Sequence, residues 1–401
     1  MNKKLIIVAS LILVLDTVFL VLFGKYYTKQ LLVHPFFYAH DLVLFALTAL
    51  CLPYFKFTKR IKSIESLFLI AFLYLIFSFY KIGFQNSYII IRQFMLFGYG
   101  ILIYIIMNRV FSLEIIKNKF INYLIYFGVF CFLVQLFYFA YLFIDKNYNP
   151  FFQRNYFSPI IILGLLVTAS YPLVYIRNVY LKHTLFFIVF IAALTMGHDS
   201  TYVALSFIYF AFWFLKASIR KKTILVSCLV LLAICIFIFV PSFSDLNMQW
   251  RLLFWKESFF RAANNFFVIG DGFGTQYALD ETIVKLNNVY AEFSNPPIIK
   301  GEDKYFCAPH NSFISMVINI GALPLLLLIY SIKDIFLNKN LLMDKDILFL
   351  SLSLLGIVVF SSFNVVLELP HSSSIFWIVF FGLLFKISDK SGLSKNKAKL
   401  R

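Results

Sequence analysis

The chain has 401 residues and a formal net charge of +17, and 61% of its residues are hydrophobic while only 14% are charged. Soluble globular domains carry about 25% charged residues, so this composition excludes an ordinary soluble protein. A basic excess can indicate nucleic-acid binding, but its distribution along this chain indicates orientation in a membrane instead.

Twelve apolar runs follow one another, and most are as long as a membrane-spanning helix, which needs about 17–25 residues. Because the backbone in hydrocarbon must satisfy its own hydrogen bonds, these runs predict α-helices rather than barrel strands. The first run is too long for the core of a signal peptide and lacks a small-residue cleavage site, so we expect it to be retained. The runs are 5–24, 36–55, 64–80, 88–107, 120–144, 157–176, 184–197, 201–215, 223–240, 312–332, 347–367 and 374–387.

Basic residues are concentrated in every second connection between the runs. With the N-terminus in the cytoplasm, the inside connections hold basic groups at 56–62, 109–119, 177–182 and 216–222, together with the tail 386–401. The short outside connections hold only Lys25, Lys29, Lys81, Lys146 and Arg154. This asymmetry follows the positive-inside rule, so both termini are expected in the cytoplasm and nucleic acid is excluded as a partner. The predicted fold class is all-α, a multi-pass membrane protein of about 12 helices.

One connection is far longer than the others. Residues 241–311 form a polar segment that we expect to lie outside the cytoplasm as a folded loop within a single membrane domain, 1–401, because long loops are usually functional and this one contains apolar residues throughout. Within it, Asn247–Phe267 is predicted to be helical. Its apolar stripe comprises Leu252, Trp255, Phe259 and Ala262.

The predicted helix has two compatible interpretations. It can lie in the membrane interface, with tryptophans such as Trp255 as anchors and Arg251 and Arg261 extending toward water. Arg251 can in addition bind a phosphate, because a guanidinium binds phosphate oxygens in pairs.

A glycine-rich stretch, Gly270–Thr275, follows this helix. No strand precedes it, so a nucleotide-binding loop is excluded. Its glycines Gly272 and Gly274 favour a tight structural turn, and direct contact with a ligand is the alternative.

Several arginines map to the outer face of the predicted topology. Arg92 lies one turn inside the outer end of its helix, where it either extends outward or faces a polar cavity. Arg154, Arg251 and Arg261 lie at or above the same face, as does His310. Several arginines on one polar surface suit an anionic ligand such as a diphosphate. A transporter would instead place polar residues at the midplane, in broken helices.

His310 and Asn311 close the long loop directly before an apolar run. An imidazole with a pKa near 6.5 can take a proton from an attacking sugar hydroxyl at neutral pH. Asn311 can orient that hydroxyl or an amide, while a hydrogen-bonded structural histidine is the alternative. No Cys-x-x-Cys pair indicates a metal site, and no cofactor is expected.

These residues resemble a known family. His310-Asn311, nine residues and then Gly321 is similar to the His-Asn/Ser/Gln-x9-Gly motif of the bacterial O-antigen ligase and polymerase superfamily. The order of Arg251, Trp255, the glycine-rich stretch and the histidine also resembles the large periplasmic loop of that family. The resemblance covers roughly 245–330, together with the twelve-helix layout.

The resemblance implies a metal-independent, inverting glycosyltransferase of the GT-C class in the bacterial inner membrane. Its donor would be an undecaprenyl-diphosphate-linked glycan, with membrane lipid and a chain-length regulator protein as candidate partners. His310 would be the catalytic base and Arg251 would neutralise the leaving diphosphate. The substrate-binding residues would be Asn311, Arg261, Arg154, Arg92, Trp255, Gly272 and Gly274.

Three functions remain open at this stage. A polymerase of lipid-linked repeat units is favoured over a ligase that transfers glycan to lipid A core, because Pro324 and Asp199-Ser200-Thr201 depart from the pattern of the family and polymerases diverge more widely. A non-enzymatic flippase or transporter is the alternative of another class. The single long loop and the absence of two similar halves argue against it.

Overall fold

The computed structural model describes residues 3–29, 32–34, 37–55, 62–144, 158–217, 246–289, 299–337 and 339–399. These residues form helices, apart from an antiparallel ribbon of two short strands, β1 (Leu32–His34) and β2 (Phe37–Tyr38). The helices of the first half are α1 (Lys3–Lys29), α2 (Ala39–Cys51), α3 (Lys62–Ile82), α4 (Ser87–Val110), α5 (Glu114–Ile144), α7 (Pro159–Tyr175), α8 (Val179–Leu194) and α9 (Asp199–Lys216). Those of the second half are α11 (Leu246–Asn264), α12 (Asp280–Val289), α13 (Asp303–Phe306), α14 (Ser312–Ile320), α15 (Leu323–Ser331), α16 (Lys333–Leu337), α17 (Lys345–Ser361) and α18 (Pro370–Lys399). Short 3-10 turns lie at Leu52–Tyr54, Phe84–Asn86 and Lys339–Met343.

Five of the described helices are long and apolar enough to cross a membrane. They are Lys4–Gly24, Lys62–Ile82, Phe84–Val110, Glu114–Ile144 and Pro370–Lys390. Four shorter apolar helices, Ala39–Tyr54, Pro159–Tyr175, Val179–Leu194 and Asp199–Leu215, accompany them. The predicted all-helical architecture with apolar helices is therefore confirmed. The count of twelve spans stays a prediction, and its run at 223–240 lies outside the described residues.

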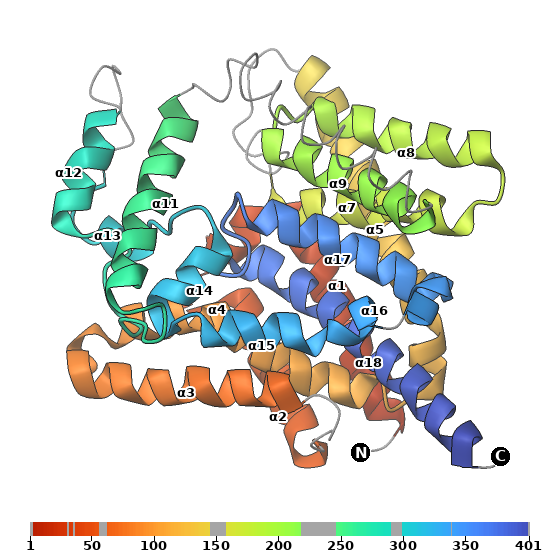
Figure 1. The fold of residues 1–401 in the computed structure, drawn as a ribbon, viewed down its shortest axis with the longest axis horizontal. Helices are drawn as coiled ribbons and strands as arrows, with labels where there is room; N and C mark the ends of the chain where they lie inside the picture. Colours follow the sequence, from red (N-terminus) through yellow and green to blue (C-terminus); the bar gives the residue numbers. More distant parts are fainter. Residues whose placement is uncertain are drawn as a thin grey trace.

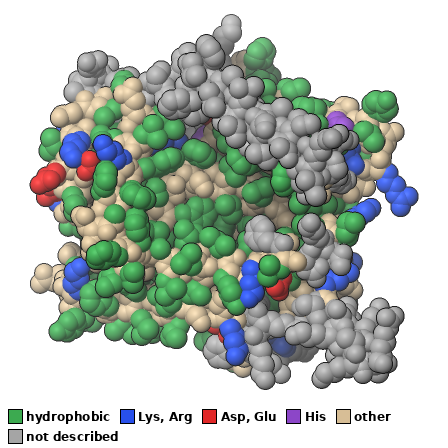
Figure 2. Space-filling model, viewed as in Figure 1, with side chains coloured by type: hydrophobic (Ala, Val, Ile, Leu, Met, Phe, Trp, Pro, Cys, Tyr) green, Lys and Arg blue, Asp and Glu red, His purple; other side chains and the backbone are tan. Residues whose placement is uncertain are grey.

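The helices pack around α7, which is buried on nearly every side. Residues 160–170 of α7 are all buried, as expected for a helix that is apolar all round. Figure 1 shows α17 and α18 crossing the middle of the bundle, with α3 along one edge and α8 along the opposite edge. Hydrophobic side chains cover the broad face of the molecule, and charged ones gather toward its edges (Figure 2). This surface suits a lipid environment.

The predicted run 312–332 is not one helix. It breaks at Gly321, whose φ of +81° ends α14, and α15 begins two residues later. A side chain at Gly321 would stand 2.3 Å from the carbonyl oxygen of Val268, so only glycine fits there. The next N–H, of Ala322, donates to the carbonyl of Phe267 at 2.8 Å. The loop that follows α11 thus packs directly against the break.

The segment from α11 to α14 has a small core of its own. Trp250 and Phe254 of α11 pack there with Leu286 of α12 and Ile318 of α14. Both chain ends lie at the end of the bundle opposite α12 and α13 (Figure 1). The polar loop and the two termini therefore occupy opposite ends of the molecule.

Candidate functional site

Arg251 anchors α11 to the rest of the molecule near the end of α17. Its Nη1 donates to the carbonyl of Phe363 at 3.0 Å, in the turn that joins α17 to α18. One helical turn further on, the indole N–H of Trp255 donates to the carbonyl of Pro309 at 2.6 Å. These two contacts fix α11 against the α17–α18 turn and against the residue that precedes His310.

His310 has a left-handed backbone conformation, with φ of +50°. Such a conformation costs about 1–2 kcal/mol for a residue other than glycine and is concentrated at functional sites. Its N–H donates to the carbonyl of Ala308 at 2.8 Å, and its ring is perpendicular to that of Trp250 at a centroid distance of 5.5 Å. The protein therefore holds this imidazole in one defined position beside α11.

The surroundings of His310 keep its imidazole uncharged. Burial, followed by the positive charge of Arg251 and by His198, lowers the pKa of His310 to about 4. Burial and then Arg251 also lower the pKa of His198, against the opposing effect of Asp199. At neutral pH the site thus holds one permanent cation and two neutral imidazoles.

Asn311 and Ser312 organise the start of α14. Asn311 caps the helix, because its Oδ1 accepts from the N–H groups of Phe313 at 3.0 Å and Ile314 at 3.1 Å. The hydroxyl of Ser312 lies 2.6 Å from Glu368 Oε2 and 3.3 Å from the carbonyl of Asn364. Burial raises the pKa of Glu368 despite hydrogen bonds that oppose it. The α17–α18 turn is thereby tied to the residues that follow His310.

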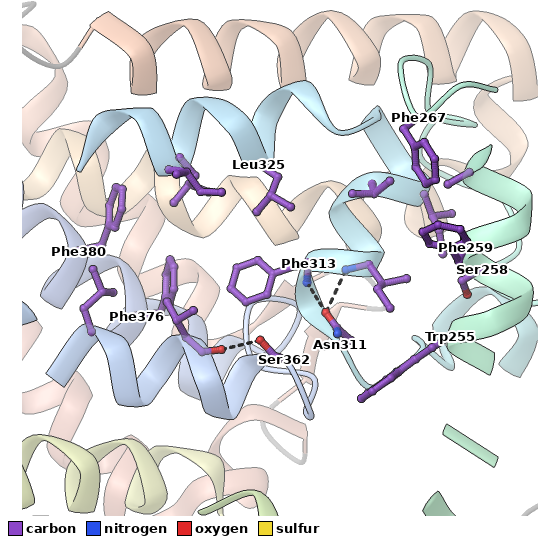
Figure 3. Close-up of a pocket in the computed structure, with 18 of the residues that line it drawn as sticks. Trp255, Ser258, Phe259, Phe267, Asn311, Phe313, Leu325, Ser362, Phe376 and Phe380 are labelled. Atoms are coloured by element: carbon purple, nitrogen blue, oxygen red, sulfur yellow. Dashed lines mark hydrogen bonds between the residues drawn. The ribbon is translucent and has the colours of Figure 1, made fainter. Parts of the chain in front are cut away.

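An apolar pocket of about 640 Å³ begins beside these residues. Trp255 and Asn311 line one end and Phe376 and Phe380 line the other, as Figure 3 shows. Its walls are formed by α11, α14, α15, α17 and α18. The stripe predicted on α11 contributes Trp255, Phe259 and Ala262 to this pocket. The buried face of α11 is the neighbouring one, with Trp250, Phe254 and Ser258.

Arg261 is occupied by contacts within the protein. Its Nε donates to Asp271 Oδ2 at 2.7 Å, and its Nη1 donates to the carbonyls of Gln276 at 2.6 Å and Tyr277 at 3.1 Å. These bonds hold the glycine-rich stretch to the end of α11. The structure therefore gives Arg261 a supporting position apart from Arg251 and His310.

The glycine-rich stretch is packed as a turn. Its five successive N–H groups, from Gly270 to Gly274, donate to Tyr74, Ile318, Asn319, Ser78 and Gln93. A side chain at Gly274 would lie 2.6 Å from Ile90, and Gly274 has a φ of +83°. Gly272 has a φ of +89°. The geometry accounts for both glycines by close packing on α3, α4 and α14.

Arg92 lies in a different buried cluster. Its Nη1 is 3.4 Å from Asp41 Oδ2 and 3.1 Å from the hydroxyl of Tyr99, which donates to Asp41 Oδ1 at 2.7 Å. Beside them, His40 Nδ1 lies 2.6 Å from Asp16 Oδ2. Arg92 is thus committed to an ion pair between α2 and α4, and Arg154 lies outside the described residues.

The structure brings together part of the predicted set: Arg251, Trp255, His310 and Asn311. Sequence reasoning did not identify His198, although the predicted topology places the connection at 198–200 on the same outer face. It assigned no role to Glu368. Comparison with models of protein families, with curated proteins and with solved structures found no match for this chain.

Proposed function

We propose that this chain is a polymerase of undecaprenyl-diphosphate-linked oligosaccharide repeat units, which transfers a growing glycan to an incoming lipid-linked repeat at the outer leaflet. The observation that carries the proposal is an apolar pocket with one end lined by Asn311, the neighbour of His310, and by Trp255, one helical turn from Arg251. Arg251 and His310 themselves lie outside the lining of this pocket. A lipid-linked diphosphate has both features that this arrangement matches, an anionic group and a long apolar chain.

The reaction needs few groups from the protein. The hydroxyl oxygen of the acceptor attacks the anomeric carbon of the donor sugar, and the bond from that carbon to the diphosphate breaks with its electron pair. Arg251 stabilises the negative charge that develops on the leaving diphosphate. His310 receives the proton of the acceptor hydroxyl. A single displacement of this kind inverts the anomeric centre.

The pocket suits the first isoprene units of the carrier. Its lining is mainly apolar, and Asn311 and Trp255 stand where the polar head would meet the tail. Burial of a CH₂ group contributes about 0.8 kcal/mol, so a few isoprene units in such a pocket add substantial affinity. The expected donor is therefore a lipid-linked diphosphate rather than a nucleotide sugar.

The decisive experiment uses the purified full chain in lipid nanodiscs with a synthetic undecaprenyl-diphosphate-linked repeat unit. We expect a ladder of lengthened glycans without added nucleotide or metal ion. Arg251→Ala should reduce the rate about 10²–10³-fold, as loss of one donor to a developing charge does in other enzymes. His310→Ala should reduce it no more than Arg251→Ala, because stabilisation of the leaving group is the larger requirement.

Arg109→Ala is the matched control, because Arg109 lies in the last turn of α4 beside Tyr54 and outside the Arg251 cluster. Its ladder should equal that of the wild type. An Arg251→Ala protein that folds and gives the wild-type ladder would contradict the scheme. Transfer to lipid A core, with no lengthening of the lipid-linked repeat, would instead indicate a ligase.

A further inference from the structure

His198 stands at the N-cap of α9, where two further side chains orient it. Its Nδ1 lies 2.8 Å from the hydroxyl of Ser200, and the same hydroxyl accepts from Asn364 Nδ2 at 2.7 Å. The ring of His198 packs on Phe360 at a centroid distance of 5.6 Å. The imidazole is therefore held in place by α9 and by the end of α17.

Asn364, which donates to the hydroxyl that contacts His198, belongs to the turn between α17 and α18. The same turn also binds Arg251 and the start of α14. Arg251 donates to the carbonyl of Phe363, Asn364 donates to Ser200, and Ser312 donates to the carbonyl of Asn364. Three segments that are distant in the sequence thus converge on two consecutive residues. This convergence places His198 in the same site as Arg251 and His310.

Two charges act on His198: the positive charge of Arg251 on α11 and the negative charge of Asp199 on its own helix. His198 in turn acts on His310, which Arg251 affects as well. From α17 it meets the uncharged ring of Phe360. Within the described residues no carboxylate accepts a hydrogen bond from His198, whose Nδ1 is bonded to Ser200.

We infer that His198 is a second cationic contact for the diphosphate of the donor, and that it takes up a proton from solvent as the diphosphate binds beside Arg251. The inference rests on the proposed function for the identity of the donor. Before binding, the charge of Arg251 opposes protonation of the imidazole. A bound diphosphate cancels that repulsion and adds an attractive negative charge, so protonation becomes favourable. One proton passes from solvent to the ring for each diphosphate that causes this change.

His310 remains the unprotonated base in the same complex. Its pKa of about 4 leaves it neutral above pH 6 even if the anion raises that pKa by a full unit. Such a rise brings it nearer to neutral pH and makes it a better base. Proton uptake on binding between pH 6 and 8 therefore measures the protonation of His198.

The experiment measures binding without turnover. Dimethyl diphosphate is the probe, because its two phosphates keep a constant charge between pH 5 and 8, as they do in a lipid-linked diphosphate. Isothermal titration calorimetry of the purified full chain, in buffers with different ionisation enthalpies, gives the dissociation constant and the number of protons taken up. We expect the wild type to bind about tenfold more tightly at pH 6 than at pH 8, the ratio that one pKa unit gives.

Three variants test the assignment. His198→Asn should bind with nearly the same affinity at both pH values and take up no proton. His198→Arg should bind tightly at both values, because its charge is permanent. His183→Asn is the matched control, since His183 also uses Nδ1, toward Tyr209 at 3.3 Å, but stacks on Trp213 in another part of the fold. It should behave as the wild type does.

The outcomes separate this inference from the proposed function. Wild-type binding with the same pH dependence in His198→Asn would overturn the role of His198 and leave the donor site intact. No binding of the probe to the wild type at any pH would overturn both the role of His198 and the diphosphate site of the proposed function.

Discussion

The fold holds His310 in an unfavourable backbone conformation and in an unfavourable environment for its charged form. A histidine at φ of +50° is strained, and the surrounding contacts from Trp250 and Trp255 hold it there. Its ring is also kept neutral by burial and by Arg251. Both features lower stability, and the proposed function gives a reason for an imidazole that stays unprotonated beside a cation.

Acid should therefore destabilise the protein through His310. Because its pKa is about 4 in the folded state and near 6.5 in the unfolded state, the unfolded chain binds the proton first as the pH falls. Stability is lost as the pH falls from 6.5 toward 4, by about 2 kcal/mol at pH 5. Thermal unfolding in detergent at pH 7.5 and 5.0 measures this loss, which His310→Gln should reduce.

His183→Gln provides the comparison for that measurement and should show the same acid-dependent loss as the wild type. Glu368 and His198 are present in the wild type and in both variants, so their contributions cancel in the comparison. A His310→Gln protein that loses as much stability as the wild type would place the acid sensitivity elsewhere.

Sequence reasoning identified the candidate reactive groups more readily than the residues that hold them in place. Arg251 and His310 were identifiable because an imidazole before an apolar run and an arginine on a predicted helix have chemical meaning on their own. The place of His198 in the site depends on Ser200 and Asn364. The hydrogen bond between Ser200 and Asn364 joins residues 164 positions apart. A pairing of this kind depends on helix packing, which no local pattern encodes.

At the scale of elements, the sequence predicts the helix within the long loop but not how that helix packs. The predicted helix Asn247–Phe267 corresponds to α11, Leu246–Asn264. Two residues of the predicted apolar stripe, Leu252 and Phe259, are exposed in the structure. The buried face is offset because Trp250 and Phe254 pack against α12, whose position the sequence does not give.

The bonds of Arg261 predict a structural role for that residue. Arg261→Ala removes one ion pair and two hydrogen bonds to carbonyls, and it should cost about 2 kcal/mol of folding free energy. The unfolding temperature should fall, whereas the affinity for dimethyl diphosphate should not change. Asn247→Ala, at an exposed position on the same helix and outside the lining of the pocket, should alter neither quantity.

Retained thermal stability combined with lost diphosphate affinity in Arg261→Ala would contradict this role and return Arg261 to the donor site. The same pair of measurements distinguishes it from Arg251. Arg251→Ala should weaken diphosphate binding, because its guanidinium lies within the proposed site.

At the scale of the whole molecule, apolar composition predicted the helical bundle and charge asymmetry predicted its orientation. Figure 1 shows both chain ends at the end opposite α12 and α13, while the number of crossings and the orientation in a membrane stay predictions. The break at Gly321 was not predictable from hydropathy, because apolar residues continue on both sides of it. It depends on the backbone of Val268, which reaches the break from the long loop.

Thiol labelling in intact cells tests the orientation. In a cysteine-free background, Lys300→Cys lies at an exposed position of the long loop and should react with a membrane-impermeant maleimide. Arg177→Cys, exposed between α7 and α8, should react only after the cells are opened. Labelling of Arg177→Cys in intact cells would contradict cytoplasmic termini and an outside loop.

The contacts at the break between α14 and α15 also limit which segments of this protein can be deleted or exchanged. The carbonyls of Ile318 and Asn319 at the end of α14 accept the N–H groups of Asp271 and Gly272, and Ala322 donates to Phe267. Deletion of the polar segment would leave these peptide groups unmatched among apolar helices, at a cost of several kcal/mol. A chimera that exchanges the segment must therefore exchange residues 266–274 and the glycine at 321 together.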